Sequence, residues 1–129
     1  MTNNQFSIHL IVNDLSESLN FYTDILNFKL VNLRGEPPFF AQLSSDSMHV
    51  HLSEVGARGD SLLKKSKGIG VKFQIEHSNV DKLYKHVKTH LPFKITQELS
   101  DFDFGWRLFS VTDFDGYEWS FYEILKSTP

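Results

Sequence analysis

The chain has 129 residues and a formal net charge of −3, which suits one domain built from one or two small modules. It contains no cysteine, so disulfides, thiolate zinc sites and a cysteine nucleophile are excluded. No basic run is long enough for a nucleic-acid footprint, and no apolar stretch approaches the roughly 20 residues of a membrane helix. The N-terminus lacks the pattern of a signal peptide, so we expect a cytoplasmic protein without nucleic-acid or membrane partners.

The first half of the chain predicts a strand, a helix and three further strands. Apolar residues alternate along "FSIHLIVND", which is typical of a strand with one buried side. Asp14 and Glu17 then form a capping-box pattern at the start of a helix. Three more alternating segments predict strands at Phe28–Leu33, Phe39–Ser44 and Met48–Leu52.

The second half repeats this pattern after a polar connector, Ser53–Gly68. "IGVKFQIE" alternates again, and Ser78 with Asp81 forms another capping-box pattern before an amphipathic helix. "LPFKIT" (Leu91–Thr96) predicts a strand, by analogy with "LNFKLV" in the first half. The segments "GWRLFSVTD" and "YEWSFYEI" predict two last strands joined by the turn "FDG".

The two halves therefore indicate an internal repeat of roughly 60 residues with the order βαβββ in each copy. The predicted fold class is α+β, with two βαβββ modules that form a curved mixed sheet around a cleft and carry their helices on the convex face. We expect a single domain, 1–129, with a first module at 5–52, a linker at 53–68 and a second module at 69–125.

Three stretches resemble the vicinal-oxygen-chelate superfamily, which includes glyoxalase I, bleomycin-resistance proteins, fosfomycin-resistance enzymes and extradiol dioxygenases. "VNDLSESLNFYTDILNFKLV" is similar to the family's opening motif, with Asn27 where Gly is usual. "GIGVKFQIEHSNVDKLYKHVK" resembles the start of the second module. "GWRLFSVTDFDGYEWSFYE" resembles the closing Asp-Pro-Asp-Gly hairpin, with Phe114 in place of Pro.

The resemblance also implies where a divalent metal is bound in metal-using members. Counted from the motifs, the four ligand positions fall on Ser7, His51, Gly70 and Ser120. Ser and Gly are poor substitutes for the His and carboxylate ligands of such sites. We therefore expect no metal and no other cofactor, which disfavours fosfomycin-transferase, dioxygenase and glyoxalase I chemistry.

Strand alternation assigns the neighbours of these positions to the same cleft. Small-molecule sites combine a few polar groups with aromatic rings, and the residues expected here have that character. The predicted ligand-binding residues are Ser7, His9, His49, His51, Lys72, Gln74, Trp106, Ser110, Glu118, Ser120 and Tyr122, with Leu108 beside them. Trp106 is expected either to stack on a planar or cationic ligand or to fill the interface between modules.

Several assignments stay open at this point. His9, His49 and His51 are an alternative, relocated metal site, because "HVH" places two imidazoles on one face of a strand. Lys72 and Glu118 are read as a structural ion pair rather than an acid–base pair. Trp119 and Phe121 have the opposite register and are expected in the core, whereas the orientation of Phe39, Phe40, Phe102 and Phe104 is undetermined.

The leading hypothesis for function is a metal-free binding protein, similar to the bleomycin-resistance branch, that takes a small aromatic or cationic molecule. One alternative is a lyase, isomerase or dioxygenase-type enzyme with the relocated His metal site. A second is a non-catalytic protein-interaction module. The resemblance also implies a homodimer, and leaves open whether modules pair within one chain or are swapped between two.

Overall fold

A computed structural model describes residues 6–46, 48–55, 68 and 70–125 of the chain. It divides into two compact units, Met1–Lys67 and Gly68–Pro129, and each is described by itself below. The division falls at the end of the expected linker, most of which lies outside the described residues. No helix of the described part has the length and apolar character needed to cross a membrane.

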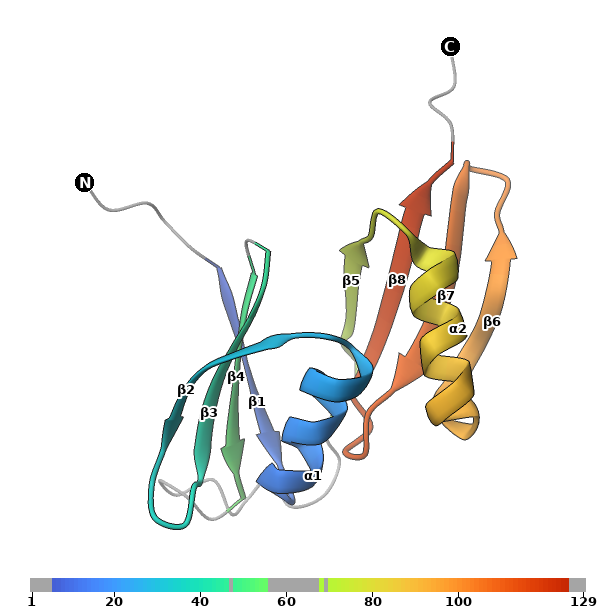
Figure 1. Ribbon diagram of the computed structural model, residues 1–129. Coiled ribbons are helices and arrows are strands. Elements are labelled where there is room, and N and C mark those ends of the chain that lie inside the picture. The colour runs from blue at the N-terminus through green and yellow to red at the C-terminus, as the bar shows by residue number, and fades with distance from the viewer. Residues whose placement is uncertain (1–5, 47, 56–67, 69, 126–129) are drawn as a thin grey trace, which may run out of the picture. The chain divides into compact units, whose positions relative to one another are not determined.

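The first unit is a four-stranded sheet with one helical segment (Figure 1). The strand order is β1-β4-β3-β2, with β1 parallel to β4 and the other pairs antiparallel. Its elements are β1 (Ser7–Val12), α1 (Leu15–Asn20), a π-helical turn (Phe21–Ile25), β2 (Lys29–Arg34), β3 (Phe40–Ser45) and β4 (Met48–Glu54).

The second unit repeats this topology with the order β5-β8-β7-β6, and β5 is parallel to β8. Its elements are β5 (Lys72–Glu76), α2 (Val80–His90), a 3-10 turn (Pro92–Lys94), β6 (Ile95–Asp101), β7 (Trp106–Thr112) and β8 (Glu118–Ile124). The α+β class and the two βαβββ modules are thus confirmed. The single cleft expected between the two sheets stays a prediction.

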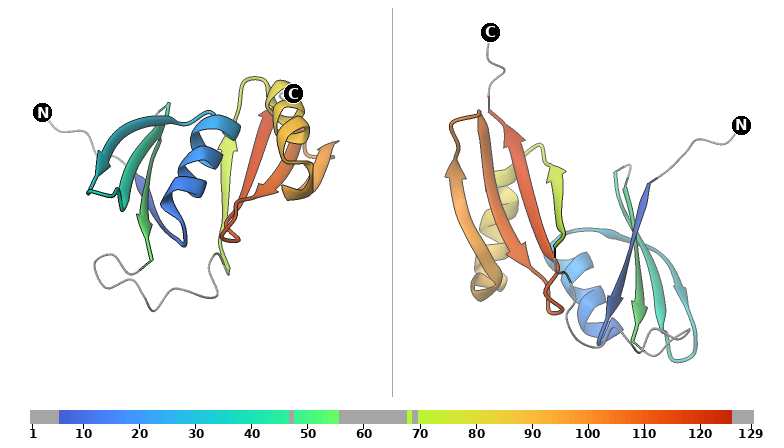
Figure 2. Two further views of the ribbon diagram at one scale, coloured as in Figure 1. Left: turned by 60° about the horizontal axis from the view of Figure 1, so that its bottom comes forward. Right: turned by 180° about the vertical axis from the view of Figure 1, so that it is seen from behind.

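Each helix covers one face of its own sheet. The second unit shows this clearly from behind, where the strands lie in front of α2 and their near face carries no helix (Figure 2). The covered faces bury apolar side chains, and each fully buried Leu or Phe stabilises the fold by about 1.5–3 kcal/mol. Trp119 and Phe121 are buried, as predicted, at 0% and 1% exposure.

Both helices begin at a side chain that accepts a backbone hydrogen bond. The Asp14 carboxylate accepts from the Glu17 amide at 3.0 Å, which confirms the predicted start of α1. The predicted cap of α2 is wrong by one residue, because Asn79 and not Ser78 accepts from the amide three positions on, that of Lys82. Either side chain satisfies an amide that has no partner within the helix.

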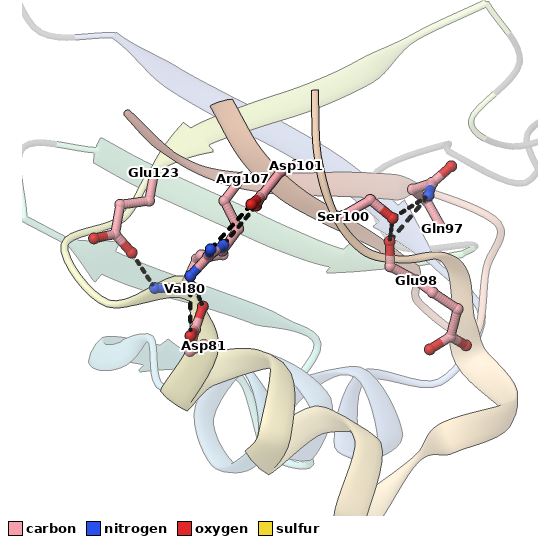
Figure 3. Close-up of polar contacts among 8 residues, drawn as sticks. All are labelled: Val80, Asp81, Gln97, Glu98, Ser100, Asp101, Arg107 and Glu123. Carbon is pink, nitrogen blue, oxygen red and sulfur yellow. Dashed lines mark hydrogen bonds and ion pairs between the residues drawn. The ribbon is translucent and has the colours of Figure 1, made fainter. Parts of the chain in front are cut away.

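A carboxylate from the last strand of each unit also binds the first turn of the helix. Glu54 of β4 accepts from the Leu15 amide at 2.9 Å, and Glu123 of β8 accepts from the Val80 amide at 3.0 Å. Figure 3 shows the second of these contacts beside Arg107, which donates to Asp101 and Asp81 and so links β7 to β6 and α2. This guanidinium lowers the pKa of Asp101 by hydrogen bonding.

Two departures from the family motifs have a local explanation. Asn27 has φ +64°, a left-handed conformation that Asn tolerates better than most residues, so it serves in the usual Gly position. In the last hairpin the buried Asp113 carboxylate accepts from the Asp115 and Tyr117 amides, which holds the turn without a proline. Phe114 instead places its ring 4.4 Å from the Lys94 ammonium.

The strand predicted at Leu91–Thr96 exists, but its predicted start is wrong. Pro92 opens a 3-10 turn that ends at Lys94, and β6 begins only at Ile95. Proline fixes φ and has no amide to donate to a ladder, so it favours the turn. β4 also extends to Glu54, which moves Ser53 and Glu54 from the expected linker into the sheet.

Candidate functional site

The predicted site residues fall on the face of each sheet that the helix of the same unit leaves uncovered. We call these the first and the second open face. Residues paired across neighbouring strands point to the same side of a sheet, so the register defines both sets. The first open face comprises Ser7, His9, Ile11, Lys29, Asn32, Arg34, Phe40, Gln42, Ser44, His49, His51 and Ser53. The second comprises Lys72, Gln74, Glu76, Gln97, Ser100, Trp106, Leu108, Ser110, Thr112, Glu118, Ser120, Tyr122 and Ile124.

On the first open face the histidines gather around a phenylalanine. Ser7 pairs with His49 and His9 with His51 between the parallel strands β1 and β4. The ring centroids of His9 and His51 lie 6.3 Å apart, and that of Phe40 lies 6.1 Å from His9 and 5.6 Å from His51. All three contacts are edge-to-face or tilted, the arrangements that aromatic rings prefer.

The centre of this cluster combines a hydrogen bond with partial burial. His9 Nε2 is hydrogen-bonded to the hydroxyl of Ser53, a residue with 0% exposure. Burial lowers the pKa of His51, and its neighbours His9 and His49 lower it further. His49 Nδ1 is buried and has no hydrogen-bond partner among the described residues.

The sequence analysis missed two members of this cluster. Ser53 was assigned to the linker, although "HVHLS" places His49, His51 and Ser53 two residues apart on one face of a strand. The sequence leaves the orientation of Phe40 undetermined, because the sequence of a single strand does not show which residues of the neighbouring strands lie beside it. Its register with Ser53 supplies that information.

Two metal sites were considered, the one implied by the resemblance and the alternative site at His9, His49 and His51. Neither fits the side chains present. Among the described residues, no group of three or more His, Cys, Asp or Glu side chains is placed to hold a metal ion. His9, His49 and His51 therefore do not form such a group. Of the positions implied by the resemblance, Gly70 precedes β5 with φ +79°, and the register gives Lys72 as the counterpart of Ser7. Ser120 is 3% exposed, and its hydroxyl is hydrogen-bonded to the Ser110 hydroxyl at 2.7 Å.

A hollow of about 400 Å³ lies at the β2–β3 side of the first unit. Its lining residues are Arg34, Phe39, Phe40 and Gln42. Arg34 pairs with Phe40 and Gln42 with His51, so the hollow adjoins the histidine cluster on the first open face. This volume falls within the range of small-molecule sites.

The second open face combines an ion pair, a serine pair and stacked rings. Lys72 Nζ lies 3.9 Å from Glu118 Oε1, and the Lys72 side chain is 66% exposed, which is typical of a weak surface ion pair. Gln74 pairs with Ser120 between β5 and β8, beside the Ser110–Ser120 hydrogen bond.

Trp106 stacks on Tyr122 at the far end of this face. The ring centroids are 3.8 Å apart and the planes differ by 10°. Phe104 meets the Trp106 ring edge-on at 5.3 Å, and Phe102 stacks on Phe104. Phe104 is 64% exposed, so this row of rings, Phe102, Phe104, Trp106 and Tyr122, reaches the surface.

These faces bring together the predicted residues of each unit separately. Ser7, His9, His49 and His51 share the first open face. Lys72, Gln74, Trp106, Ser110, Glu118, Ser120 and Tyr122 share the second. The small-molecule ligand and the homodimer stay predictions, because the structure describes a single chain.

Comparison with known proteins gives a consistent picture of the fold. The family model described as Glyoxalase/Bleomycin resistance protein/Dioxygenase superfamily matches residues 4–121. No curated protein sequence matches the chain.

Several solved structures are similar to the chain. TioX from Micromonospora sp. ML1 has a TM-score of 0.76 at 20% identity, over 95% of this chain and 100% of TioX. A glyoxalase/bleomycin resistance protein/dioxygenase from Nocardioides has a TM-score of 0.75 at 18% identity, over 99% of this chain and 87% of its own. The fosfomycin resistance protein FosX from Listeria monocytogenes has a TM-score of 0.69 at 19% identity, over 95% of this chain and 94% of FosX. At identities this low, the structural similarity shows a shared fold and nothing more.

Proposed function

Because the chain belongs to the Glyoxalase/Bleomycin resistance protein/Dioxygenase superfamily, we propose that it binds a small aromatic molecule without a divalent metal. The ligand lies against an open face of one of the sheets. The superfamily includes both enzymes and binding proteins, so the fold alone does not select between them. The side chains of the open faces support a binding protein.

One observation carries this proposal: the open faces keep aromatic and polar side chains where metal-using members place ligands. Ser7 is exposed, Lys72 stands at the counterpart of Ser7 in the second unit, and the Ser120 hydroxyl is hydrogen-bonded to that of Ser110. A divalent metal needs several His, carboxylate or thiolate donors, which these positions lack. Metal-dependent lyase or dioxygenase chemistry therefore has no support from this donor set.

The aromatic character of the ligand is supported on both faces. Trp106 and Tyr122 form a stacked pair on the second, and Phe40 lies between His9 and His51 on the first. Rings of this kind bind planar molecules by stacking and by edge contacts, each worth about 0.5–1.5 kcal/mol beyond area burial.

Titration of the chelator-treated protein with a neutral planar probe, 2-naphthamide, tests the proposal. By isothermal titration calorimetry in EDTA we expect saturable binding, and an affinity reduced about three- to tenfold in Phe40→Ala. Trp119→Phe is the control, because Trp119 is fully buried on the helix side of its sheet. Its affinity should equal that of the wild type.

Two results would overturn the proposal. One is binding that appears only after zinc or another divalent ion is restored. The other is about one bound metal per chain in protein purified without chelator, since resident metal at that level indicates a metal site.

A further inference from the structure

We infer that the ligand is an aromatic anion whose acidic group, a carboxylate or similar oxyanion, is bound by Arg34 on the first open face. This inference rests on the proposed function and specifies its ligand class. It replaces the cationic ligand that the sequence left open.

The charge of the first open face is the first reason. Arg34 and Lys29 lie on β2 and point to this face, as their pairing with Phe40 and Ser44 shows. Within the described residues, the face defined above contains no carboxylate. Glu54, the acid at the end of β4, is engaged at the Leu15 amide. A face with two cations and no acid attracts anions and repels cations.

Arg34 is also free to bind, in contrast to Arg107. The Arg107 guanidinium is held by Asp101 at 2.6 Å and by Asp81 at 3.2 Å. Among the residues that the structure describes, no carboxylate lies within ion-pair distance of Arg34. Its planar array of donors therefore remains available for the two oxygens of a carboxylate.

The hollow beside Arg34 supplies the aromatic part of the site. Its other lining residues are two rings and an amide, those of Phe39, Phe40 and Gln42. The Phe39 ring packs against Gly35, where an added Cβ would clash with a ring carbon. A planar ligand against these rings places its acidic group at the guanidinium, with the Gln42 amide as a further donor.

Three probes with one ring system and different charges test the inference: 2-naphthoate, 2-naphthamide and 2-naphthylmethylammonium. By isothermal titration calorimetry in EDTA we expect 2-naphthoate to bind about tenfold more tightly than the other two, because charge-assisted hydrogen bonds are the stronger ones. Arg34→Gln should remove this preference and change the affinity for 2-naphthamide by less than about twofold.

Two further variants separate charge at this position from charge in general. Arg34→Lys keeps the charge and loses the planar fork, so part of the preference should remain. Lys85→Gln removes one exposed cation from α2 in the other unit and should change none of the affinities. Equal circular dichroism of the variants checks that the fold is intact.

The outcomes also distinguish this inference from the proposed function. If the amide or the ammonium probe binds as tightly as 2-naphthoate, or if Arg34→Gln keeps the preference, the inference is wrong and the proposed function stands. If none of the three probes binds, both are wrong.

Discussion

The two modules share one scaffold and differ in the chemistry of their open faces. In each, a carboxylate from the last strand binds the first turn of the helix: Glu54 in the first and Glu123 in the second. At equivalent positions in the register, His51 and Gln42 of the first module correspond to Ser120 and Ser110 of the second. What the modules have in common therefore holds the helix on the sheet, and what differs is available for binding.

The largest expected effect separates the two faces of the second module. Trp119→Ala should lower the free energy of unfolding by about 3–5 kcal/mol, because it empties a fully buried position. Trp106→Ala should cost roughly 1 kcal/mol, since it removes a ring stacked on Tyr122 at a partly exposed site. Urea unfolding followed by circular dichroism measures both. Equal losses would contradict the assignment of Trp106 to a binding surface.

The helix-anchoring carboxylates should give equal effects if the modules are equivalent. Glu54→Ala and Glu123→Ala each leave a helix amide without its acceptor, at a cost of about 1–2 kcal/mol. The same urea experiment measures this. A loss confined to one variant would show that the repeat is one of sequence pattern and not of energetics.

The histidines predict a pH dependence for the first module. The pKa of His51 in the folded chain lies below its ordinary value of 6.5. Between these two pKa values the unfolded chain binds more protons than the folded chain. Stability should therefore fall as the pH is lowered through the ordinary value to below the folded one. His51→Gln should reduce the difference between the urea midpoints at about pH 7.5 and about pH 5.5. An unchanged difference would contradict the assignment of this pH dependence to His51.

The smallest expected effect concerns the second open face. Lys72→Gln breaks the 3.9 Å contact with Glu118 and should change the free energy of unfolding by less than about 1 kcal/mol, because the pair is exposed. A loss several times larger would indicate that Lys72 has a structural role which its exposure does not suggest.

The sequence predicted the parts of this fold that depend on local periodicity. Alternation along "FSIHLIVND" and "MHVHL" placed His9, His49 and His51 on one face, and the Asp14 pattern located the start of α1. The repeat then gave the topology of the second module from that of the first.

The sequence did not predict the contacts between neighbouring strands. Nothing along the chain shows that Arg34 lies beside Phe40, that Ser53 reaches His9, or that Ser110 and Ser120 share a hydrogen bond. Each of these depends on the register between two strands, which tertiary packing sets. The sequence thus predicted which side chains share each open face, but not the charge of the first open face, on which the proposed class of ligand depends.

Calorimetric titration of 2-naphthoate into the chelator-treated protein, before and after addition of stoichiometric zinc, tests metal-independent binding most directly. With the EDTA removed by dialysis before the titrations, we predict saturable binding without zinc and an affinity that zinc leaves unchanged within about twofold. Binding that is absent without zinc and restored by zinc would contradict it.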